Sequence, residues 1–343
     1  MKAIILVGGQ GTRLRPLTDH LPKNIVPLCG APFLHYPLRQ LKKAGIREVA
    51  FSVGYKSQAI RKVYGDGRKL GMRFHYALEK EPLGTGGAIK NAERFVKGHP
   101  VVVLNGDILT DLPLSKMIAF HRKKRSAATL GLVRVEDPTA YGLVLLDRQK
   151  RVTRFLEKPT AKEAVTDTIN AGVYLFEPQV FGFLPAGIQY SAERGLFPDL
   201  LASRTPFFGY VWDGYWPDIG TPRKYLTTHW DILKGAFTPP APFRKKGGVH
   251  WGKGVKLGQG ARVMGPAMLG DGCVLGAGAR VGPLTVLGRG CRIGEGAVVE
   301  KSVLWDGASV GPGVRVKECL LGRRARVVSP PEPGLVLGDS VRR

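Results

Sequence analysis

The sequence predicts an α/β protein in two parts, an open, mainly parallel sheet followed by a parallel β-helix. Over about the first 120 residues, short apolar runs alternate with amphipathic stretches, a pattern typical of strands and helices in such a sheet. A six-residue repeat runs through residues 251–327. Residues 244–343 also hold 22 of the 46 glycines and no tyrosine. A hexapeptide period is the signature of a parallel β-helix.

The elements of the first part are expected in a regular order. Apolar runs predict strands at residues 3–7, 48–53, 72–76 and 101–104, and amphipathic stretches predict helices at 33–44, 57–64 and 88–96. Further strands are expected at 127–135, 142–146, 152–156 and 171–176, and a helix from near Pro222 to Lys234. Open sheets of this kind bind ligands beyond the carboxyl ends of their strands.

A glycine-rich loop follows the first predicted strand. Gly8, Gly9 and Gly11 lack the Cβ atoms that keep a backbone away from a ligand, and glycine permits positive φ. Such a turn aims successive N–H groups at one point, which suits phosphate oxygens. Arg13 adds a fork-shaped cation and Lys23 a point charge. A bare Gly-x-Gly is more often an ordinary strand-to-helix turn, so the assignment of this loop depends on the wider motif.

The wider motif closely resembles the signature of the sugar-1-phosphate nucleotidyltransferases. It reads GGQGTRLRPLT over residues 8–18, with Pro22 and Lys23 just after it. It is neither a Walker loop nor a Gly-x-Gly-x-x-Gly dinucleotide fingerprint. Within the family, residues 1–235 look most like the mannose-1-phosphate guanylyltransferases, and residues 52–88 also resemble the heptose-1-phosphate guanylyltransferases.

The resemblance implies the reaction of a nucleoside triphosphate with a sugar 1-phosphate to give a nucleotide sugar and pyrophosphate. In this family the sugar-phosphate oxygen attacks the α-phosphorus in line, without a covalent enzyme intermediate. Such chemistry mainly needs alignment and charge neutralisation, which suits Gly, Arg, Lys and Asp side chains. The resemblance also implies a Rossmann-like, open, mixed and mainly parallel sheet.

The resemblance further implies which residues form the site. Arg13 would grip the departing pyrophosphate, Lys23 would neutralise the α-phosphate, and Lys158 would bind the phosphate of the sugar phosphate. Asp107 and Asp218 would hold Mg²⁺, a hard cation usually bound by one or two carboxylates plus substrate phosphates. The nucleotide would contact Leu6, Gly8, Gly9, Gly11, Thr12, Glu81, Gly84 and Thr85, and the sugar phosphate would contact Gly142, Glu157, Lys158 and Asn170.

Some of these residues have simpler interpretations. Asp107 after a buried strand is also suited to capping the next element, and Asp218 to closing a turn. Lys158 alone would be a surface lysine. A catalytic function is favoured over a non-catalytic regulatory subunit on the same fold because the loop residues and both aspartates are present together.

Guanine is the expected base. Its Watson–Crick edge carries the adjacent donors N1–H and N2–H₂, and one carboxylate can accept from both. Glu81 stands just before the glycine-rich residues 84–87 and is our candidate for this contact. The alternative is that Glu81 faces solvent and backbone groups read the base. GTP and mannose 1-phosphate are therefore the first expectation. The alternatives are a glucose-1-phosphate thymidylyl-, uridylyl- or adenylyltransferase and a heptose-1-phosphate guanylyltransferase.

The repeat places a large residue every six positions from Trp251 to Val327, with two steps of five residues. We expect these residues to point inward, with a small residue such as Ala279 or Cys291 filling the interior four positions later. The pattern resembles the left-handed β-helix hexapeptide family. The expected domains are a nucleotidyltransferase domain at 1–235, a Pro- and Gly-rich linker at 236–250, the β-helix at 251–329 and a tail at 330–343.

Composition limits the remaining possibilities. The net charge of +25 is spread over the chain, with +15 in residues 1–243 and +10 in residues 244–343. The basic runs contain no interleaved aromatic residues, so we expect no specific nucleic acid partner. The charge suits anionic substrates. No apolar run is long enough to span a bilayer, and the four cysteines contain no Cys-x-x-Cys pair, which favours a cytoplasmic location. We also expect a homo-oligomer, because exposed β-helix edges favour association.

Overall fold

The computed structural model of the 343-residue chain describes every residue except 55 and 240–243. The chain forms two compact units, described separately here: residues 1–9 with 37–216, and residues 10–36 with 217–343. Within the described residues, no helix combines the length and the apolar character needed to cross a membrane.

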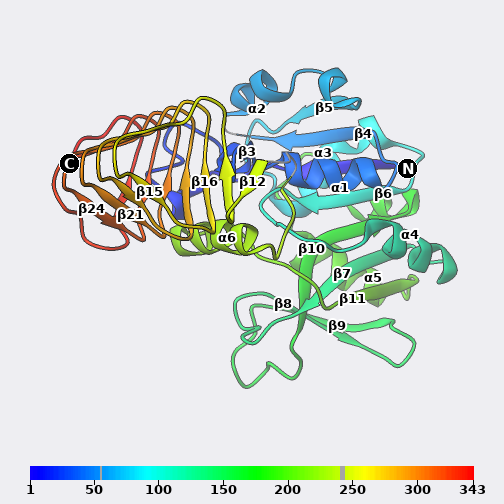
Figure 1. Ribbon diagram of the computed structural model, residues 1–343. Helices are drawn as coiled ribbons and strands as arrows, with labels where there is room; N and C mark the ends of the chain where they lie inside the picture. The colour runs from blue at the N-terminus through cyan, green and yellow to red at the C-terminus, as the bar shows by residue number, and fades with distance from the viewer. Residues whose placement is uncertain (55, 240–243) are drawn as a thin grey trace. The chain divides into compact units, whose positions relative to one another are not determined.

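The first unit is built on a nine-stranded mixed sheet, which confirms the predicted α/β class and adds one strand to the eight that were predicted (Figure 1). Its main path runs in the order β11-β7-β10-β6-β1-β4-β5, with β8 and β9 attached through β10. Strands β6, β1, β4 and β5 are mutually parallel, whereas β10 runs antiparallel to β6 and β7. The strands are β1 Lys2–Leu6, β4 Glu48–Val53, β5 Arg73–Leu78, β6 Val101–Asn105, β7 Ala128–Arg134, β8 Gly142–Leu146, β9 Val152–Glu157, β10 Thr168–Phe176 and β11 Phe207–Trp212.

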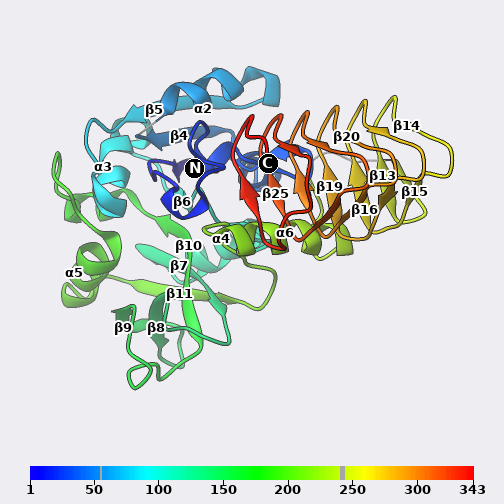
Figure 2. The ribbon, with the colours of Figure 1, turned by 90° about the vertical axis from the view of Figure 1, so that its left-hand side faces the viewer.

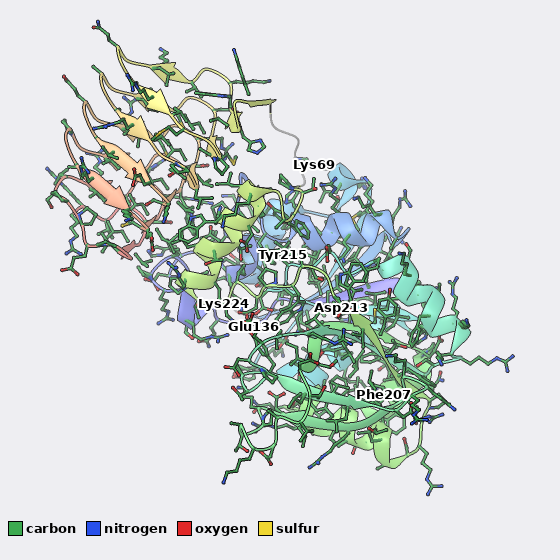
Figure 3. The ribbon with its side chains drawn as sticks, turned by 60° about the horizontal axis from the view of Figure 1, so that its bottom comes forward. Lys69, Glu136, Phe207, Asp213, Tyr215 and Lys224 are labelled. Atoms are coloured by element: carbon green, nitrogen blue, oxygen red, sulfur yellow. The ribbon has the colours of Figure 1, made fainter. Side chains whose placement is uncertain are left out.

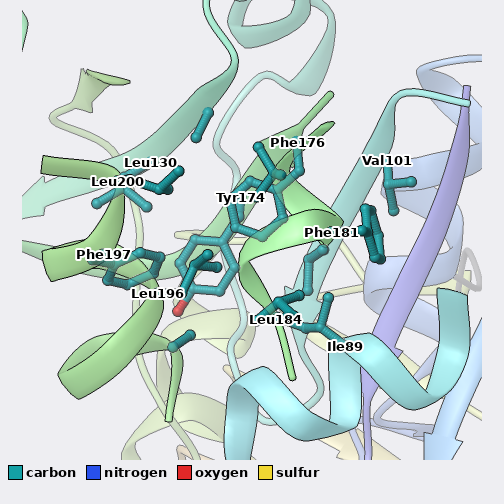
Figure 4. Close-up of a cluster of buried hydrophobic side chains, with 14 of the residues drawn as sticks. Ile89, Val101, Leu130, Tyr174, Phe176, Phe181, Leu184, Leu196, Phe197 and Leu200 are labelled. Atoms are coloured by element: carbon teal, nitrogen blue, oxygen red, sulfur yellow. The ribbon is translucent and has the colours of Figure 1, made fainter. Parts of the chain in front are cut away.

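Helices cover the apolar faces of this sheet. The helices are α1 His35–Lys43, α2 Ser57–Tyr64, α3 Gly84–Val96, α4 Leu114–Lys123 and α5 Phe197–Ala202, with π-type helix at Ala192–Leu196. Helix α3 packs on β1, β4 and β5, and α4 packs on β7 and β11. The buried ring of Tyr174 packs against Phe176 and Phe197 inside a cluster of buried hydrophobic side chains (Figure 4). Central strands buried on both faces explain why residues 101–104 are continuously apolar.

The main differences from the sequence prediction lie at element ends. Helix α3 begins at Gly84 and not at residue 88, so the glycine-rich stretch forms its first turn. Strand β10 begins at Thr168, three residues before the predicted start. The sequence patterns also missed α4, α5 and β11, since short elements in contact with a core carry little periodicity of their own.

The second unit combines the chain after Gly9 with the C-terminal part. Short helical turns at Thr12–Leu14 and Lys23–Ile25 precede the hairpin of β2 Pro27–Leu28 and β3 Ala31–Pro32. Helix α6, Pro222–Lys234, begins on an N-cap threonine and ends on a glycine with positive φ. The Tyr225 hydroxyl donates to the Pro27 carbonyl oxygen and accepts from Trp305 Nε1, which lies 3.1 Å away. These bonds connect the loop segment, α6 and the β-helix within one unit.

The C-terminal strands form the three parallel faces of the predicted left-handed β-helix (Figure 2). Apart from the strand at Arg244–Lys246, which pairs antiparallel with the strand that follows it, each face stacks parallel strands that lie one coil apart in sequence. The inward residues form one continuous apolar cluster. Cys273, Cys291 and Cys319 are free and fully buried in this interior, as small core fillers should be. The faces are β12 Arg244–Lys246, β13 Val249–Trp251, β16 Ala267–Leu269, β19 Thr285–Leu287, β22 Val303–Leu304, β25 Leu320–Leu321 and β27 Val336–Leu337; β14 Lys256–Leu257, β17 Val274–Leu275, β20 Arg292–Ile293, β23 Ser309–Val310 and β26 Arg326–Val327; and β15 Arg262–Val263, β18 Arg280–Val281, β21 Val298–Glu300 and β24 Arg315–Lys317.

The two ends of the β-helix differ. At the C-terminal end, backbone bonds between residues 326–328 and 341–343 add a further layer beyond β26. At the other end, β14 and β15 each pair on one side only. Leu257 in β14 is 48% exposed, although its register partner Leu275 is 1% exposed. Met264, just after β15, is 47% exposed, so this end presents unpaired edges and apolar side chains together.

The predicted domain bounds follow motifs and repeats, whereas the two compact units follow spatial contact. Residues 10–36 and 217–235 share a unit with the β-helix, although the motif pattern groups them with the rest of 1–235. Residues 240–243 of the predicted linker at 236–250 lie outside the described residues. The predicted domain bounds stay a prediction.

Candidate active site

The carboxyl end of β1 carries the first part of the glycine-rich loop in the first unit. The Val7 N–H donates to the Ser52 carbonyl at 2.9 Å, and the Gly106 N–H donates to the Leu6 carbonyl at 2.9 Å. A Cβ atom at Gly54 would lie 3.1 Å from the Gly8 carbonyl oxygen. The loop is therefore held against the ends of two neighbouring parallel strands, where ligands of open α/β sheets bind.

A carboxylate lies directly against this loop, and it belongs to Glu79 and not to Glu81. Glu79 Oε1 accepts from the Ser52 hydroxyl at 2.9 Å, and Oε2 accepts from the Leu83 N–H at 3.3 Å. A Cβ atom at Gly8 would lie only 2.9 Å from Glu79 Oε1, so glycine is what admits the carboxylate here. Glu81 is exposed. Glu79 and Glu81 are two positions apart, and the sequence does not show which of the two side chains turns toward the loop.

The glycines at the start of α3 pack against the chain at residues 188–192. A Cβ at Gly84 would lie 2.8 Å from the Tyr190 carbonyl oxygen, and one at Gly87 would lie 2.7 Å from the Ile188 carbonyl oxygen. Close packing within the first unit thus accounts for these glycines. Thr85 Oγ1 donates to Glu193 Oε2 at 2.5 Å and accepts from the Ala192 N–H at 2.8 Å. Nucleotide binding by Gly84 and Thr85 stays a prediction.

A polar cluster on β8, β9 and β10 brings together three residues predicted to bind the sugar phosphate. Gly142 pairs with Glu157 across β8 and β9, and a Cβ at Gly142 would lie 3.0 Å from Glu157 Oε2. Asn170 Nδ2 donates to the Tyr174 hydroxyl at 3.0 Å, and Asn170 Oδ1 accepts from the Gly172 N–H at 3.0 Å. A bulge in β10 between residues 170 and 173 produces this arrangement.

The cluster includes two residues that the sequence interpretation missed, Asn105 and Glu193. A Cβ at Gly172 would lie 2.6 Å from Asn105 Nδ2, and Asn105 Oδ1 is buried without a hydrogen-bond partner among the described residues. Burial and then the charge of Glu193 raise the pKa of Glu157, while Lys158 and Arg194 oppose the shift. A buried acceptor without a partner and a carboxyl with a raised pKa are features typical of functional sites that bind polar groups.

Two other predicted residues of the first unit lie at strand ends. Asp107 follows β6 and is half-buried. Lys158 follows β9 with φ of 50°, and its side chain is exposed while its N–H donates to the Tyr141 carbonyl at 3.0 Å. The left-handed backbone at Lys158 is unusual for a side chain of this kind and fixes its direction relative to the strand.

The second part of the loop belongs to the second unit. Gly11 has φ of 69°, and its carbonyl accepts from the Thr18 hydroxyl at 2.8 Å. A Cβ at Gly11 would lie 3.1 Å from Lys23 Cβ, so the glycine lets the two helical turns approach. Thr12 and Arg13 form the first of these turns and Lys23 starts the second. The two cations are thus held close to a backbone that only glycine can adopt without strain.

Asp218 lies in the same unit between cationic groups. Its Oδ1 accepts from the Gly220 N–H at 2.9 Å, and its Oδ2 accepts from Lys224 Nζ. A Cβ at Gly220 would lie 2.7 Å from Asp218 Oδ1 and 2.8 Å from Arg13 Nη2, so glycine is needed between them. Burial raises the pKa of Asp218, but the bonds from Lys224 and Gly220 and the charges of Lys224 and Arg13 lower it below its usual value.

The donor chemistry fits a small divalent cation. Asp107 and Asp218 offer hard oxygen ligands, and Asp218 is held in its ionised form. The described residues contain no group of three or more His, Cys, Asp or Glu side chains suited to a metal. A site of one or two carboxylates completed by substrate phosphates is the arrangement that Mg²⁺ favours. Asp107 and Asp218 belong to different units, so their joint use stays a prediction.

The mixed sheet, the glycine-rich loop after β1 and the turn that holds Arg13 and Lys23 are the features that the sequence predicts for an enzyme that transfers nucleotidyl groups. The profile of the Nucleotidyl transferase family matches residues 2–235, and that of the GMPPB C-terminal domain matches residues 263–342. The chain belongs to the Nucleotidyl transferase family, which confirms the family and the enzyme class predicted from the sequence.

Individual relatives differ in their substrates. The mannose-1-phosphate guanylyltransferase of Mycobacterium tuberculosis is 41% identical over 264 residues, which are 77% of this chain and 73% of that protein. The UTP–glucose-1-phosphate uridylyltransferase of Synechocystis sp. is 31% identical over 341 residues, covering 94% and 87% of the two chains. HddC from Yersinia pseudotuberculosis, solved with GMP-PN, is 30% identical with a TM-score of 0.56, covering 67% of this chain and 99% of its own.

Proposed function

We propose that the protein transfers the guanylyl group of GTP to mannose 1-phosphate, forming GDP-mannose and pyrophosphate in the cytoplasm. The observation that carries the choice of guanine is the Glu79 carboxylate lying against the Gly8 loop. The similarity to the Mycobacterium tuberculosis guanylyltransferase at 41% identity supports the same base and sugar. The similarity to a uridylyltransferase over 94% of the chain makes UTP with glucose 1-phosphate the second candidate.

Glu79 is suited to select guanine. Each of its oxygens accepts one hydrogen bond within the protein, and a carboxylate oxygen can accept a second. The adjacent N1–H and N2–H₂ donors of guanine can bind both oxygens at once, and such charge-assisted pairs are the stronger kind. Uracil and thymine would instead turn carbonyl oxygens toward the carboxylate, which leaves buried groups unpaired. We therefore assign to Glu79 the contact that the sequence alone suggested for Glu81.

The basic side chains bind the phosphate groups of the two substrates. Arg13 neutralises the departing pyrophosphate and Lys23 the α-phosphate, while Lys158 orients the attacking sugar phosphate. Gly142, Glu157 and Asn170 bind sugar hydroxyls, and Asn105 and Glu193 belong to the same subsite. Asp107 and Asp218 hold Mg²⁺, which when bound adds positive charge on the transferring phosphate. The protein residues thus align two anions and offset their repulsion, with no covalent intermediate on the chain.

The test is a matrix of GTP, UTP, dTTP and ATP against mannose, glucose and heptose 1-phosphates, read by pyrophosphate release. We expect GTP with mannose 1-phosphate to give the highest kcat/KM. Glu79→Gln should lower kcat/KM for GTP by about 10- to 100-fold, the range of one charge-assisted pair, and the matched variant Glu81→Gln should leave it unchanged. Preference for UTP or dTTP would reject the guanine assignment, and an effect confined to Glu81→Gln would return that role to Glu81.

We also propose that the protein is a homo-oligomer that uses the N-terminal end of its β-helix. The unpaired edges of β14 and β15 and the exposed Leu257 and Met264 favour pairing with a second copy. Light scattering of the full chain should show a dimer or larger assembly, and the double variant Leu257→Lys, Met264→Lys should be smaller. Val328→Lys, an exposed residue (49%) near the other end, is the control. A monomeric wild type would contradict the proposal.

A further inference from the structure

The first turn of α6 carries two cations where a helix favours anions. Arg223 and Lys224 follow directly on Pro222, and this turn contains no acidic residue. The N-terminus of a helix bears a partial positive charge, so lysine and arginine are electrostatically unfavourable there. Each cation is compensated from elsewhere in the second unit, Arg223 by Glu318 at 2.9 Å and Lys224 by Asp218.

The partner of Lys224 is the residue proposed above as a metal ligand. Lys224 Nζ bonds to Asp218 Oδ2, while Oδ1 accepts from the Gly220 N–H at 2.9 Å. The Asp218 side chain is 11% exposed and that of Lys224 is 42% exposed, so the lysine is the more solvent-accessible partner of the pair. Lys224 is drawn on α6 in Figure 3.

We propose that Lys224 is an internal counter-ion that competes with the divalent cation for Asp218. The ammonium compensates the Asp218 carboxylate when no metal is bound, and the incoming cation replaces it at Oδ2. One cation is thus exchanged for another at a single carboxylate oxygen. Lys224 is thus a positioning residue, and the inference depends on the proposed metal role of Asp218.

Competition predicts that removing the ammonium strengthens metal binding. In the full-length protein without nucleotide, Lys224→Met should lower the Kd for Mn²⁺ by about two- to tenfold, the range expected for a partly exposed ion pair. Lys224→Arg keeps a cation in place and should retain the wild-type Kd. Arg223→Met removes the same charge one residue away, from an arginine paired with Glu318, and should change the Kd by less than about twofold.

Isothermal titration with Mn²⁺ measures these constants, and thermal unfolding with and without Mn²⁺ gives a second reading. The increase in Tm caused by the metal should be larger in Lys224→Met than in the wild type, which a purely structural role of Lys224 does not produce. Unchanged or weaker Mn²⁺ binding in Lys224→Met overturns the inference, as does an equal gain in Arg223→Met.

Asp218→Asn distinguishes the metal role of Asp218 from the competition by Lys224. Its Mn²⁺ binding should weaken strongly if Asp218 is a ligand. Wild-type binding in Asp218→Asn removes the metal role itself, and the inference with it. Weakened binding in Asp218→Asn together with unchanged binding in Lys224→Met leaves the metal role intact and rejects the competition alone.

Discussion

The sheet of the first unit and the β-helix both contain parallel strands, yet they differ in how their polar groups are placed. Around the strand ends of the sheet, Asn105 Oδ1 is buried without a partner among the described residues, and Glu157 is a carboxyl whose pKa is raised. The β-helix interior stacks apolar side chains in register, coil after coil. Asn105 and Glu157 lie in a different unit from the repetitive core, so substitutions at strand ends of the sheet and inside the β-helix should affect activity and stability separately.

The largest expected effect is on turnover alone. Asp107→Asn, at the end of β6, should lower kcat/KM by about 100- to 1,000-fold, the scale of one lost electrostatic contribution to a transition state. Its Tm should stay within about 2 °C of the wild type, because a half-buried polar residue contributes little to the core. Asp137→Asn is the exposed control and should match the wild type in both measurements. Near-normal activity in Asp107→Asn would contradict its catalytic assignment.

The next effect is on stability alone. Leu275→Ala removes a fully buried side chain of the β-helix and should lower the free energy of unfolding by about 2–5 kcal/mol. Leu257→Ala removes the register partner of the same column at the open end and should cost less than about 1 kcal/mol. Denaturant unfolding at one fixed protein concentration compares them, since assembly also contributes to stability. The kcat/KM of folded Leu275→Ala should equal that of the wild type.

A smaller effect concerns pH and the second unit. The imidazole of His229 is fully buried on α6, and its Nδ1 accepts from the Cys29 N–H at 3.4 Å. Burial lowers the pKa of His229 to about 3, although the Pro27 backbone opposes the shift. Between pH 6.5 and 3 the unfolded chain therefore binds a proton that the folded chain does not, so stability falls with falling pH.

This single group contributes at most about 1.4 kcal/mol per pH unit, which is the effect of one proton. His229→Gln should flatten the pH dependence of the free energy of unfolding below pH 6.5, even if it lowers stability at pH 7. His99→Gln, an exposed histidine, is the control and should leave the slope unchanged. An unaltered slope in His229→Gln would show that another group titrates.

The smallest effect should come from the β-helix cysteines. Cys291 occupies the same small-residue position in its repeat as Ala279 and Ala297, and all three are fully buried. Cys291→Ala should therefore change the free energy of unfolding by less than about 1 kcal/mol and leave activity unchanged. In the wild type, the thiol should react with a thiol reagent only after unfolding. Rapid labelling of the folded protein would show that the β-helix interior is more open than its packing implies.

Periodic features were the part of this protein that could be predicted from its sequence. The inward column of Leu275, Ile293 and Val310 follows from a six-residue period, because a coil repeats the same environment at fixed spacing. The strand before Gly8 was predicted equally well, from a short apolar run. Short elements such as α5 were missed because tertiary packing and not local pattern forms them.

The candidate site was predicted to the level of motifs but not of side-chain directions. Glu79 and Glu81 are two positions apart and chemically identical, and only the packing at Gly8 and Ser52 distinguishes them. Asn105 gives no signal in the sequence, since its importance lies in an oxygen left without a partner by the fold. Lys224 gives no signal within the predicted helix, because its ion pair with Asp218 depends on the turn between them.

The chain passes between its two units after Gly9, after Tyr36 and after Trp216. A single crossover between related genes would therefore separate the β-helix from other segments of its own unit. A chimaera joined near residue 240 would take α6 with Tyr225 from one parent and Trp305 from the other, although these side chains share a hydrogen bond. Where two parents differ at these contacts, a chimaera should therefore take the loop segment, α6 and the β-helix from the same parent.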